Sequence, residues 1–203
     1  EAPCNLSIAG LPMASYFAGS TTGRVTAVVD DCGRYVVHDL DPAATDIAIV
    51  VEATNYKRTA SLLLGRPAGV GIDSKIDALV VTELTLSGWT TQAGSNPDMS
   101  EGYLVQYTTT NAAPLSGEQV AKDGGSPFSN PVGTVPWASY FTGTAPFAAI
   151  DAGATTTLET GTAFAVLGPG TFSLDGFRPG RRCRIMNLQQ VANTLIYVSA
   201  PNC

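Results

Sequence analysis

The sequence predicts an all-β fold, and composition is the first reason. The chain has 203 residues, of which 44% are hydrophobic and 14% charged, as is typical of a globular protein. Its 21 glycines and 13 prolines favour turns, and its many threonines and valines favour strands. The second reason is alternation, because Ile47, Ile49 and Val51 recur at every second position. The third reason is that turn-forming residues separate such runs.

Residues 25–59 are predicted to form a β-meander of three strands. Turn-forming residues separate its strand-like runs at Asp30–Gly33 and again at Asp41–Pro42. The middle run, Gly33–Val37, is rich in aromatic and β-branched residues. Upstream of the meander, we expect a strand at Asn5–Ala9.

A four-residue match indicates an internal repeat. The letters of Ala14–Phe17 return at Ala138–Phe141, each time with a proline two residues before and a glycine two residues after. Each match precedes a run that contains aspartate, and an apolar run introduced by glycine follows. We therefore expect two copies of one module.

The middle of the chain, residues 73–101, is predicted to connect two modules at 1–72 and 102–203. Apolar residues between Asp73 and Leu84 recur near helical spacing behind an N-cap candidate at Asp73 or Ser74. Val80, Thr82 and Leu84 also alternate as in a strand, and β-branched residues weaken a helix. We expect a short helix there, followed by a boundary loop.

The second half is predicted to contain further strands and one long loop. The strands are expected at 103–107, 155–158, 162–167, 171–174 and 195–199. Between the first two of these strands, the polar segment Lys122–Val135 is longer than most connections in compact domains. We expect it to form a mobile surface loop.

Several short motifs resemble the carboxypeptidase regulatory-like family, whose members are transthyretin-like β-sandwich modules of secreted bacterial proteins. In the first half the motifs are Asp30–Tyr35, Leu40–Pro42 and Glu52–Tyr56, with Asn55 where the family usually has glycine. Asparagine tolerates the left-handed backbone conformation that glycine supplies there. The weaker second-half motifs are Pro114–Val120, Thr160–Phe164 and Gly168–Gly170.

The resemblance implies two tandem transthyretin-like or Ig-like β-sandwich modules. In that family such modules are accessory or structural parts and not catalysts. The chain also has no carboxypeptidase active site, G-x-S-x-G elbow, H-E-x-x-H motif or Walker-type loop. We therefore expect neither an enzyme nor a cofactor.

Charge and hydropathy exclude two further classes. A net charge of −6 argues against a nucleic-acid partner, which would need clustered positive charge. The basic residues that do cluster are predicted to lie in a solvated loop beside Cys183; they are Arg178, Arg181, Arg182 and Arg184. No apolar run reaches the roughly 18 residues of a membrane span.

The four cysteines are predicted to form disulfides. Cys4, Cys32, Cys183 and Cys203 lie far apart and form no C-x-x-C pair, which disfavours zinc and thioredoxin-like chemistry. Of the three connectivities, the local one pairs Cys4 with Cys32 and Cys183 with Cys203, and the sequence leaves all three open. Disulfides indicate an oxidising compartment, and the start at Glu1–Pro3 suits a mature secreted form.

Candidate metal and acid groups have simpler explanations. His38 beside Asp39 and Asp41 lacks the three or four ligands of a zinc site, so we expect an exposed histidine. Asp30, Asp31, Asp39 and Asp41 could together bind calcium, although turn formation explains them equally well. A carboxylate pair for glycoside hydrolysis stays open, because its separation is not visible in a sequence.

The function predicted from these observations is that of a non-catalytic extracellular structural or interaction protein. Edge strands of sandwiches pair readily, so we expect a homo-oligomer, a filament or attachment to other surface proteins. The candidate donor strand is Asn5–Leu11, with Asn5, Leu6 and Ile8. The alternative is a glycan-binding module that uses Trp137, Tyr140 and the 122–135 loop, although aromatic residues such as these more often fill a core.

Overall fold

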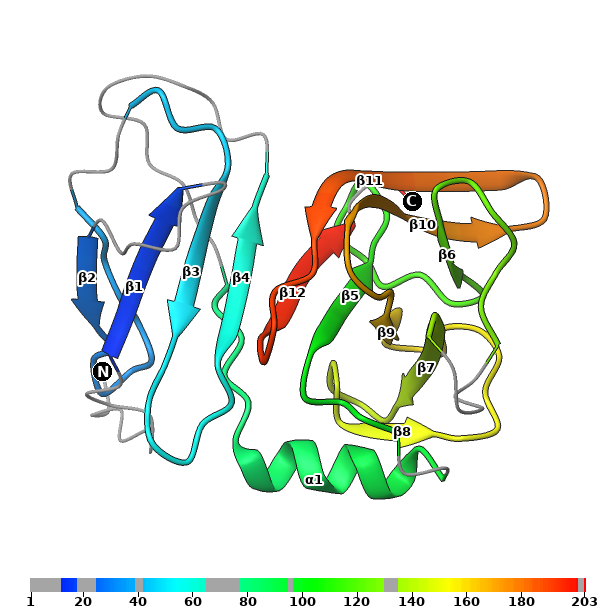
Figure 1. The fold of residues 1–203 in the computed structure, drawn as a ribbon, viewed down its shortest axis with the longest axis horizontal. Coiled ribbons are helices and arrows are strands. Elements are labelled where there is room, and N and C mark those ends of the chain that lie inside the picture. Colours follow the sequence, from blue (N-terminus) through cyan, green and yellow to red (C-terminus); the bar gives the residue numbers. More distant parts are fainter. Residues whose placement is uncertain are drawn as a thin grey trace. The chain divides into compact units, whose positions relative to one another are not determined.

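The computed structural model describes residues 12–17, 25–38, 42–64, 77–94, 97–129, 135–200 and 203. The described residues form twelve strands and one short helix, which confirms the all-β prediction (Figure 1). The chain divides into two compact units, Glu1–Glu83 and Leu84–Cys203. No described helix is long and apolar enough to cross a membrane.

The first unit contains one antiparallel sheet in the order β2-β1-β3-β4. Its strands are β1 (Pro12–Phe17), β2 (Val25–Val28), β3 (Ile47–Val51) and β4 (Thr59–Leu63). The predicted meander is wrong in its connectivity, because β1 lies between β2 and β3 and pairs with both. The repeated residues Ala14–Phe17 therefore lie in β1, the middle strand of β2-β1-β3.

The predicted strand at Gly33–Val37 is also wrong, because residues 34–38 belong to no strand. Burial still alternates along this segment: Tyr35 and Val37 pack against the Val29, Ile49 and Val51 core, whereas Val36 is 62% exposed. An extended segment can bury alternate side chains without joining a ladder. Its aromatic and β-branched residues alone did not distinguish the two cases.

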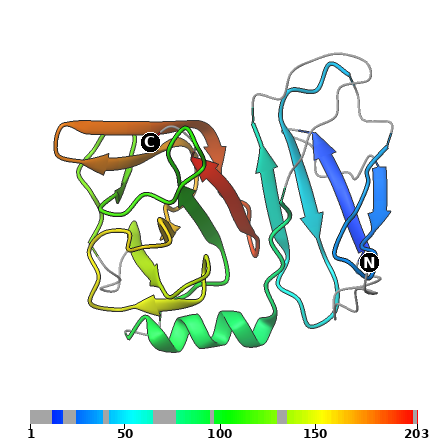
Figure 2. The same cartoon turned by 180° about the vertical axis from the view of Figure 1, so that it is seen from behind.

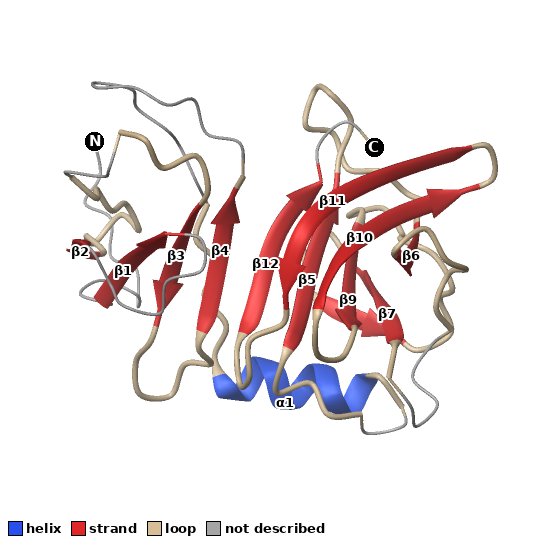
Figure 3. Cartoon of the chain, turned by 45° about the horizontal axis from the view of Figure 1, so that its top comes forward, coloured by secondary structure: helices blue, strands red, loops and turns tan. Residues whose placement is uncertain are grey.

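The second unit contains two sheets that pack against each other as a sandwich. One has the order β12-β5-β9-β7-β8 (Figure 1). The other has the order β11-β10-β6, and Figure 3 shows β11 and β10 side by side as a long hairpin. Tyr103 of one sheet and Phe172 of the other make an edge contact with ring centroids 5.5 Å apart. The bounds of these strands are β5 (Gly102–Tyr107), β6 (Gln119–Lys122), β7 (Trp137–Thr142), β8 (Ala149–Asp151), β9 (Thr162–Val166), β10 (Thr171–Arg178), β11 (Arg181–Gln189) and β12 (Leu195–Ala200).

Four of the five strands predicted for the second half are present, namely β5, β9, β10 and β12. The strand predicted at 155–158 is wrong, because residues 155 and 156 form bends and residues 157 and 158 belong to no strand. There the Thr157 N–H donates to the Glu118 carbonyl, and the Thr157 hydroxyl donates to the Leu115 carbonyl. Strands β6, β7, β8 and β11 were not predicted as strands.

The two repeated tetrapeptides occupy matching strands. β7, which contains Ala138–Phe141, is the middle strand of β8-β7-β9, as β1 is of β2-β1-β3, and all four pairings are antiparallel. The strand added beside each set of three comes from a different place in the sequence. In the first unit β4 pairs with β3 and follows it, whereas in the second unit β5 pairs with β9 but precedes β7. The shared arrangement is thus three strands, and the remaining connectivity differs.

The helix prediction is wrong in position. Residues 77–82 are not helical, and α1 runs from Glu83 to Gln92 (Figure 2). Leu79 is held in the preceding segment, because its N–H donates to Ser61 Oγ and its carbonyl accepts from Thr59 Oγ1. Side-chain bonds to β4 thus compete with helix formation, which begins only beyond them.

The buried face of α1 packs inside the second unit. Leu86 and Trp89 are its buried residues, and the Trp89 ring makes an edge contact with Phe141 at 5.1 Å between centroids. The helix ends near the edge of β8, where Gln92 Oε1 accepts the Ile150 N–H at 2.9 Å. A side chain of α1 therefore covers part of that edge.

Candidate functional site

The structure buries the aromatic residues that were candidates for ligand contact. Trp137 is 5% exposed and stacks on Phe164 with ring centroids 5.4 Å apart. Tyr140 is fully buried, and its hydroxyl oxygen accepts the Val120 N–H at 3.1 Å. A sugar-stacking surface needs exposed ring faces, so the glycan platform predicted at these residues is wrong and their role is in the core.

Other predicted site residues lie outside the described part of the chain. These are the donor-strand candidates Asn5, Leu6 and Ile8, together with Cys4, Asp39 and Asp41. The donor strand therefore stays a prediction. His38 and Asp31 are described, and both are exposed.

Asp30 organises the turn that follows β2. Its Oδ1 accepts the N–H groups of Cys32 and Arg34 at 2.9 and 2.8 Å, and its Oδ2 accepts Arg34 Nε at 2.9 Å. The backbone hydrogen bond from Arg34 is the main cause that lowers the pKa of Asp30. The Asp30 carboxylate thus already accepts hydrogen bonds from two residues of its own turn.

The same turn brings ligand atoms of Asp30, Asp31 and Cys32 within 4.8 Å of one another. The Cys32 sulfur is disulfide-bonded, so it is not a thiolate ligand. Two neighbouring carboxylates alone fall short of the six to eight oxygen ligands typical of a calcium site. Turn formation is the role that these contacts support.

The arginine cluster is not a solvated loop, which corrects the sequence prediction. Arg178 ends β10, and the other three arginines lie on β11. Arg182 and Arg184 both bond to Asp175, whose side chain is fully buried. Arg184 Nε lies 2.7 Å from one carboxylate oxygen, and the Gly124 N–H donates to the other at 2.7 Å. A buried carboxylate thus fixes the register of the β10–β11 hairpin.

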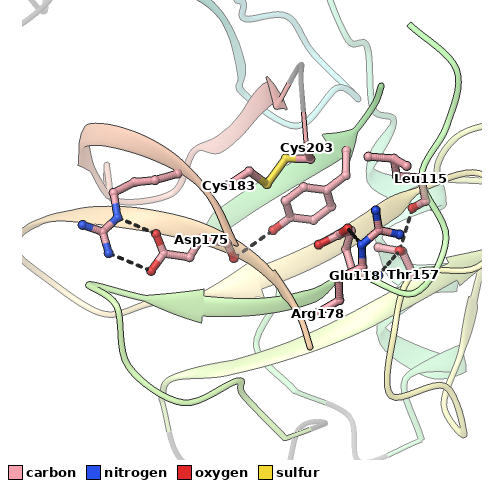
Figure 4. Close-up of a disulfide and its surroundings, with 9 residues drawn as sticks. Leu115, Glu118, Thr157, Asp175, Arg178, Cys183 and Cys203 are labelled. Atoms are coloured by element: carbon pink, nitrogen blue, oxygen red, sulfur yellow. Dashed lines mark hydrogen bonds and ion pairs between the residues drawn. A yellow bond between two sulfur atoms is a disulfide. The ribbon is translucent and has the colours of Figure 1, made fainter. Parts of the chain in front are cut away.

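A second buried carboxylate belongs to Glu118, which directly precedes β6 and faces Arg178 at the end of β10. Its side chain is 1% exposed, and Oε1 lies 3.2 Å from Arg178 Nε (Figure 4). Within the described residues neither carboxylate oxygen has a hydrogen-bond partner. Burial raises the pKa of Glu118, and the charges of Arg178 and Arg181 oppose that rise.

A disulfide lies between the two carboxylates. Cys183 of β11 is bonded to Cys203, which confirms that half of the local pairing (Figure 4). Beside it, the Tyr107 hydroxyl donates to the Asp175 carbonyl at 3.3 Å. Cys32 is also disulfide-bonded, and its predicted partner Cys4 lies outside the described residues.

Together these contacts form a structural cluster, which we call the buried charge cluster; it consists of Tyr107, Glu118, Asp175, Arg178, Cys183 and Cys203 with Arg182 and Arg184. Every carboxylate in it faces an arginine, and its sulfurs are joined to each other. Ion-paired buried carboxylates stabilise a fold only through their partners, and removing one partner leaves a costly buried charge. The arrangement is suited to holding two sheets together.

Glu118→Gln is expected to change how stability depends on pH. Because the native pKa is raised above its ordinary 4.5, the folded chain keeps a proton that the unfolded chain releases. The free energy of unfolding of the parent chain therefore falls as pH rises from 4.5 through that raised pKa, and the variant lacks this contribution. Urea unfolding between about pH 4 and pH 7 measures the difference.

Glu159→Gln is the matched control. Its backbone hydrogen bonds, the one within Glu159 itself first and then that from Gly143, lower the pKa of Glu159. That group contributes stability above its unfolded pKa, so its removal should change the pH dependence in the opposite sense. Identical pH profiles for Glu118→Gln and the parent chain would contradict the assignment of Glu118 as a buried titrating group.

Comparisons with known proteins add little to this geometry. No family model matches the chain, and no curated protein matches it. A solved structure described as the streptococcal ancillary pilin aligns with a TM-score of 0.29 and 9% sequence identity. The alignment covers 96% of this chain but only 62% of that one.

Proposed function

We propose that this chain is a non-catalytic extracellular structural protein that assembles by β-strand addition. The observation that carries the proposal is the edge strand β2, which pairs only with β1 among the described strands. Its residues Val25–Val28 include no charge, and Val28 is 62% exposed. Natural sheets usually protect such edges with charges, bulges or covering segments, because an open edge accepts another strand.

Two further observations support an extracellular structural role. The Cys183–Cys203 disulfide and the bonded Cys32 fit an oxidising compartment. The buried carboxylates Asp175 and Glu118 face arginines in the sheets, an arrangement that supports the fold. A protein that bears load or forms a lattice benefits from sheets fixed in this way.

Assembly of the non-reduced chain is the direct test. Light scattering and negative-stain imaging should find particles larger than the 21.0 kDa chain. Deletion of residues 1–11 should abolish growth, because the proposed donor strand Asn5–Leu11 is then missing. A control deletion of two residues, Glu1 and Ala2, keeps both Cys4 and the donor segment and should assemble normally.

The outcomes are separable. A parent chain that stays at 21.0 kDa at all concentrations would contradict the proposed function. Growth beyond two copies that survives deletion of residues 1–11 would contradict only the donor strand and leave growth through another segment.

A further inference from the structure

The edges of the described sheets differ in how they are protected. The β8 edge is covered by Gln92 of α1, which accepts the Ile150 N–H, and the strand ends at Asp151. The β6 edge is covered by Phe128, whose N–H donates to the Val120 carbonyl at 2.8 Å. β11 carries three arginines, at 181, 182 and 184. These are the devices by which sheets avoid adding strands.

The β2 edge has none of these devices among the described residues. Val25–Val29 is an uncharged run with three valines and a threonine, which are strong strand formers. The turn after it is rigid, because Asp30 N–H donates to the Arg34 carbonyl at 2.8 Å while the Asp30 carboxylate bonds back to Arg34. The edge is therefore preformed and needs no ordering before it pairs.

Exposed apolar side chains flank this turn symmetrically. Asp30 and Arg34 are joined by a backbone hydrogen bond. Val28 lies two residues before Asp30 and Val36 two residues after Arg34, and each side chain is 62% exposed. Both are large hydrophobic residues that water contacts in the single chain. Removing these side chains from water against a partner favours association.

Charge decides which partner this edge fits. A chain with a net charge of −6 repels a second copy unless the contact is free of like charges. When identical strands pair antiparallel across a two-fold axis, residue i of one copy faces residue j of the other and residue j faces residue i. A charge on the strand therefore enters the contact twice, and like charges directly opposite each other are destabilising. The β2 run meets this condition, whereas β6, β8 and β11 all bring charged residues to the contact.

We infer that β2 pairs with β2 of a second copy of this chain, in an antiparallel isologous dimer that also covers Val28 and Val36. This inference rests on the proposed function, because it names the acceptor surface and the partner of the same assembly. An isologous contact closes at two copies. The donor strand at residues 5–11 takes no part in this contact and concerns only growth beyond two copies.

Val28→Lys tests the inference, because it places in the proposed contact a charged side chain that no opposite charge on β2 neutralises. The test uses a chain that lacks residues 1–11 and carries Cys32→Ser, because loss of Cys4 would leave a thiol able to cross-link two copies. This chain is expected to have the mass of two copies, and Val28→Lys in that background should halve it. Val36→Lys is the second variant and should weaken dimerisation at least tenfold. Sedimentation equilibrium measures both.

Matched controls separate folding from pairing. Val28→Thr keeps a neutral β-branched residue and should remain dimeric, while Val191→Lys alters an exposed valine of the second unit and should have no effect. Circular dichroism checks that each variant is folded. If the parent chain is monomeric even at high concentration, both the proposed function and this inference are overturned. An assembling parent whose Val28→Lys and Val36→Lys variants, both folded, assemble equally well would overturn the inference alone.

Discussion

Gly176→Ala is expected to lower the free energy of unfolding by roughly 3 kcal/mol, at the upper end of the usual cost of overpacking. A Cβ at Gly176 would lie 2.6 Å from Cys183 Sγ and 2.6 Å from a carbon of the Tyr107 ring. Neither neighbour can move away easily. Cys183 is fixed by its bond to Cys203, and the Tyr107 ring is fully buried with its hydroxyl bonded to Asp175.

Gly88→Ala is the matched control for this substitution. No atom lies within 4 Å of a Cβ built at Gly88, which is in the interior of α1. Alanine is a better helix former than glycine, so this variant should gain about 1 kcal/mol. Urea unfolding of both non-reduced variants gives the comparison, and equal midpoints for Gly176→Ala and the parent would show that the sheet relaxes around the disulfide.

The strands of the second unit that the sequence predicted correctly share one property: most residues of at least one face of each are buried. β5 and β9 are nearly buried throughout, and their apolar runs are continuous. β6 and β8 were missed because they have only four and three residues, too few for a periodic pattern. Segment 34–38 shows the converse, since its alternation reflects packing of Tyr35 and Val37 without a ladder.

The buried charge cluster could have been found by following the register of one hairpin. Pro179-Gly180 forms a two-residue turn, and Gly180 has a φ of 81° that suits glycine. From that turn, Arg178 must pair with Arg181 and Asp175 with Arg184, as the structure shows. Reading the arginines as a loop ignored the register and therefore missed their carboxylate.

The contact of Glu118 with Arg178 could not be predicted in the same way. Sixty residues separate the two, and their meeting depends on β6 pairing with β10. Likewise Trp137 and Tyr140 are buried by residues distant in the sequence: Trp137 stacks on Phe164, and the Tyr140 hydroxyl bonds to Val120 of β6. The sequence contained the residue types, but only the order of strands in the sheets determines which side chains face water.

Asp175→Asn is the second large effect, with an expected loss of about 3 kcal/mol in the free energy of unfolding. The substitution keeps the size of the side chain but removes the charge that two guanidinium groups share. Arg182 and Arg184 are 30% and 42% exposed, so water can rehydrate them partly, which places the loss at the low end for a broken buried ion pair. The Gly124 N–H keeps an acceptor only if the amide oxygen faces it.

Glu52→Gln shows whether burial or the ion pair itself causes this loss. Glu52 faces Arg58 at 3.4 Å, but its side chain is 67% exposed, so its removal should cost less than about 1 kcal/mol. Urea unfolding of both variants at high and low salt separates the causes further, because salt screens the exposed pair and leaves the buried one almost unchanged. If Asp175→Asn costs no more than Glu52→Gln, the desolvation of Asp175 already cancels its attraction to the two arginines. The sheet would then be held by the disulfide and by packing around Tyr107, and the arginines would serve only to neutralise a buried charge.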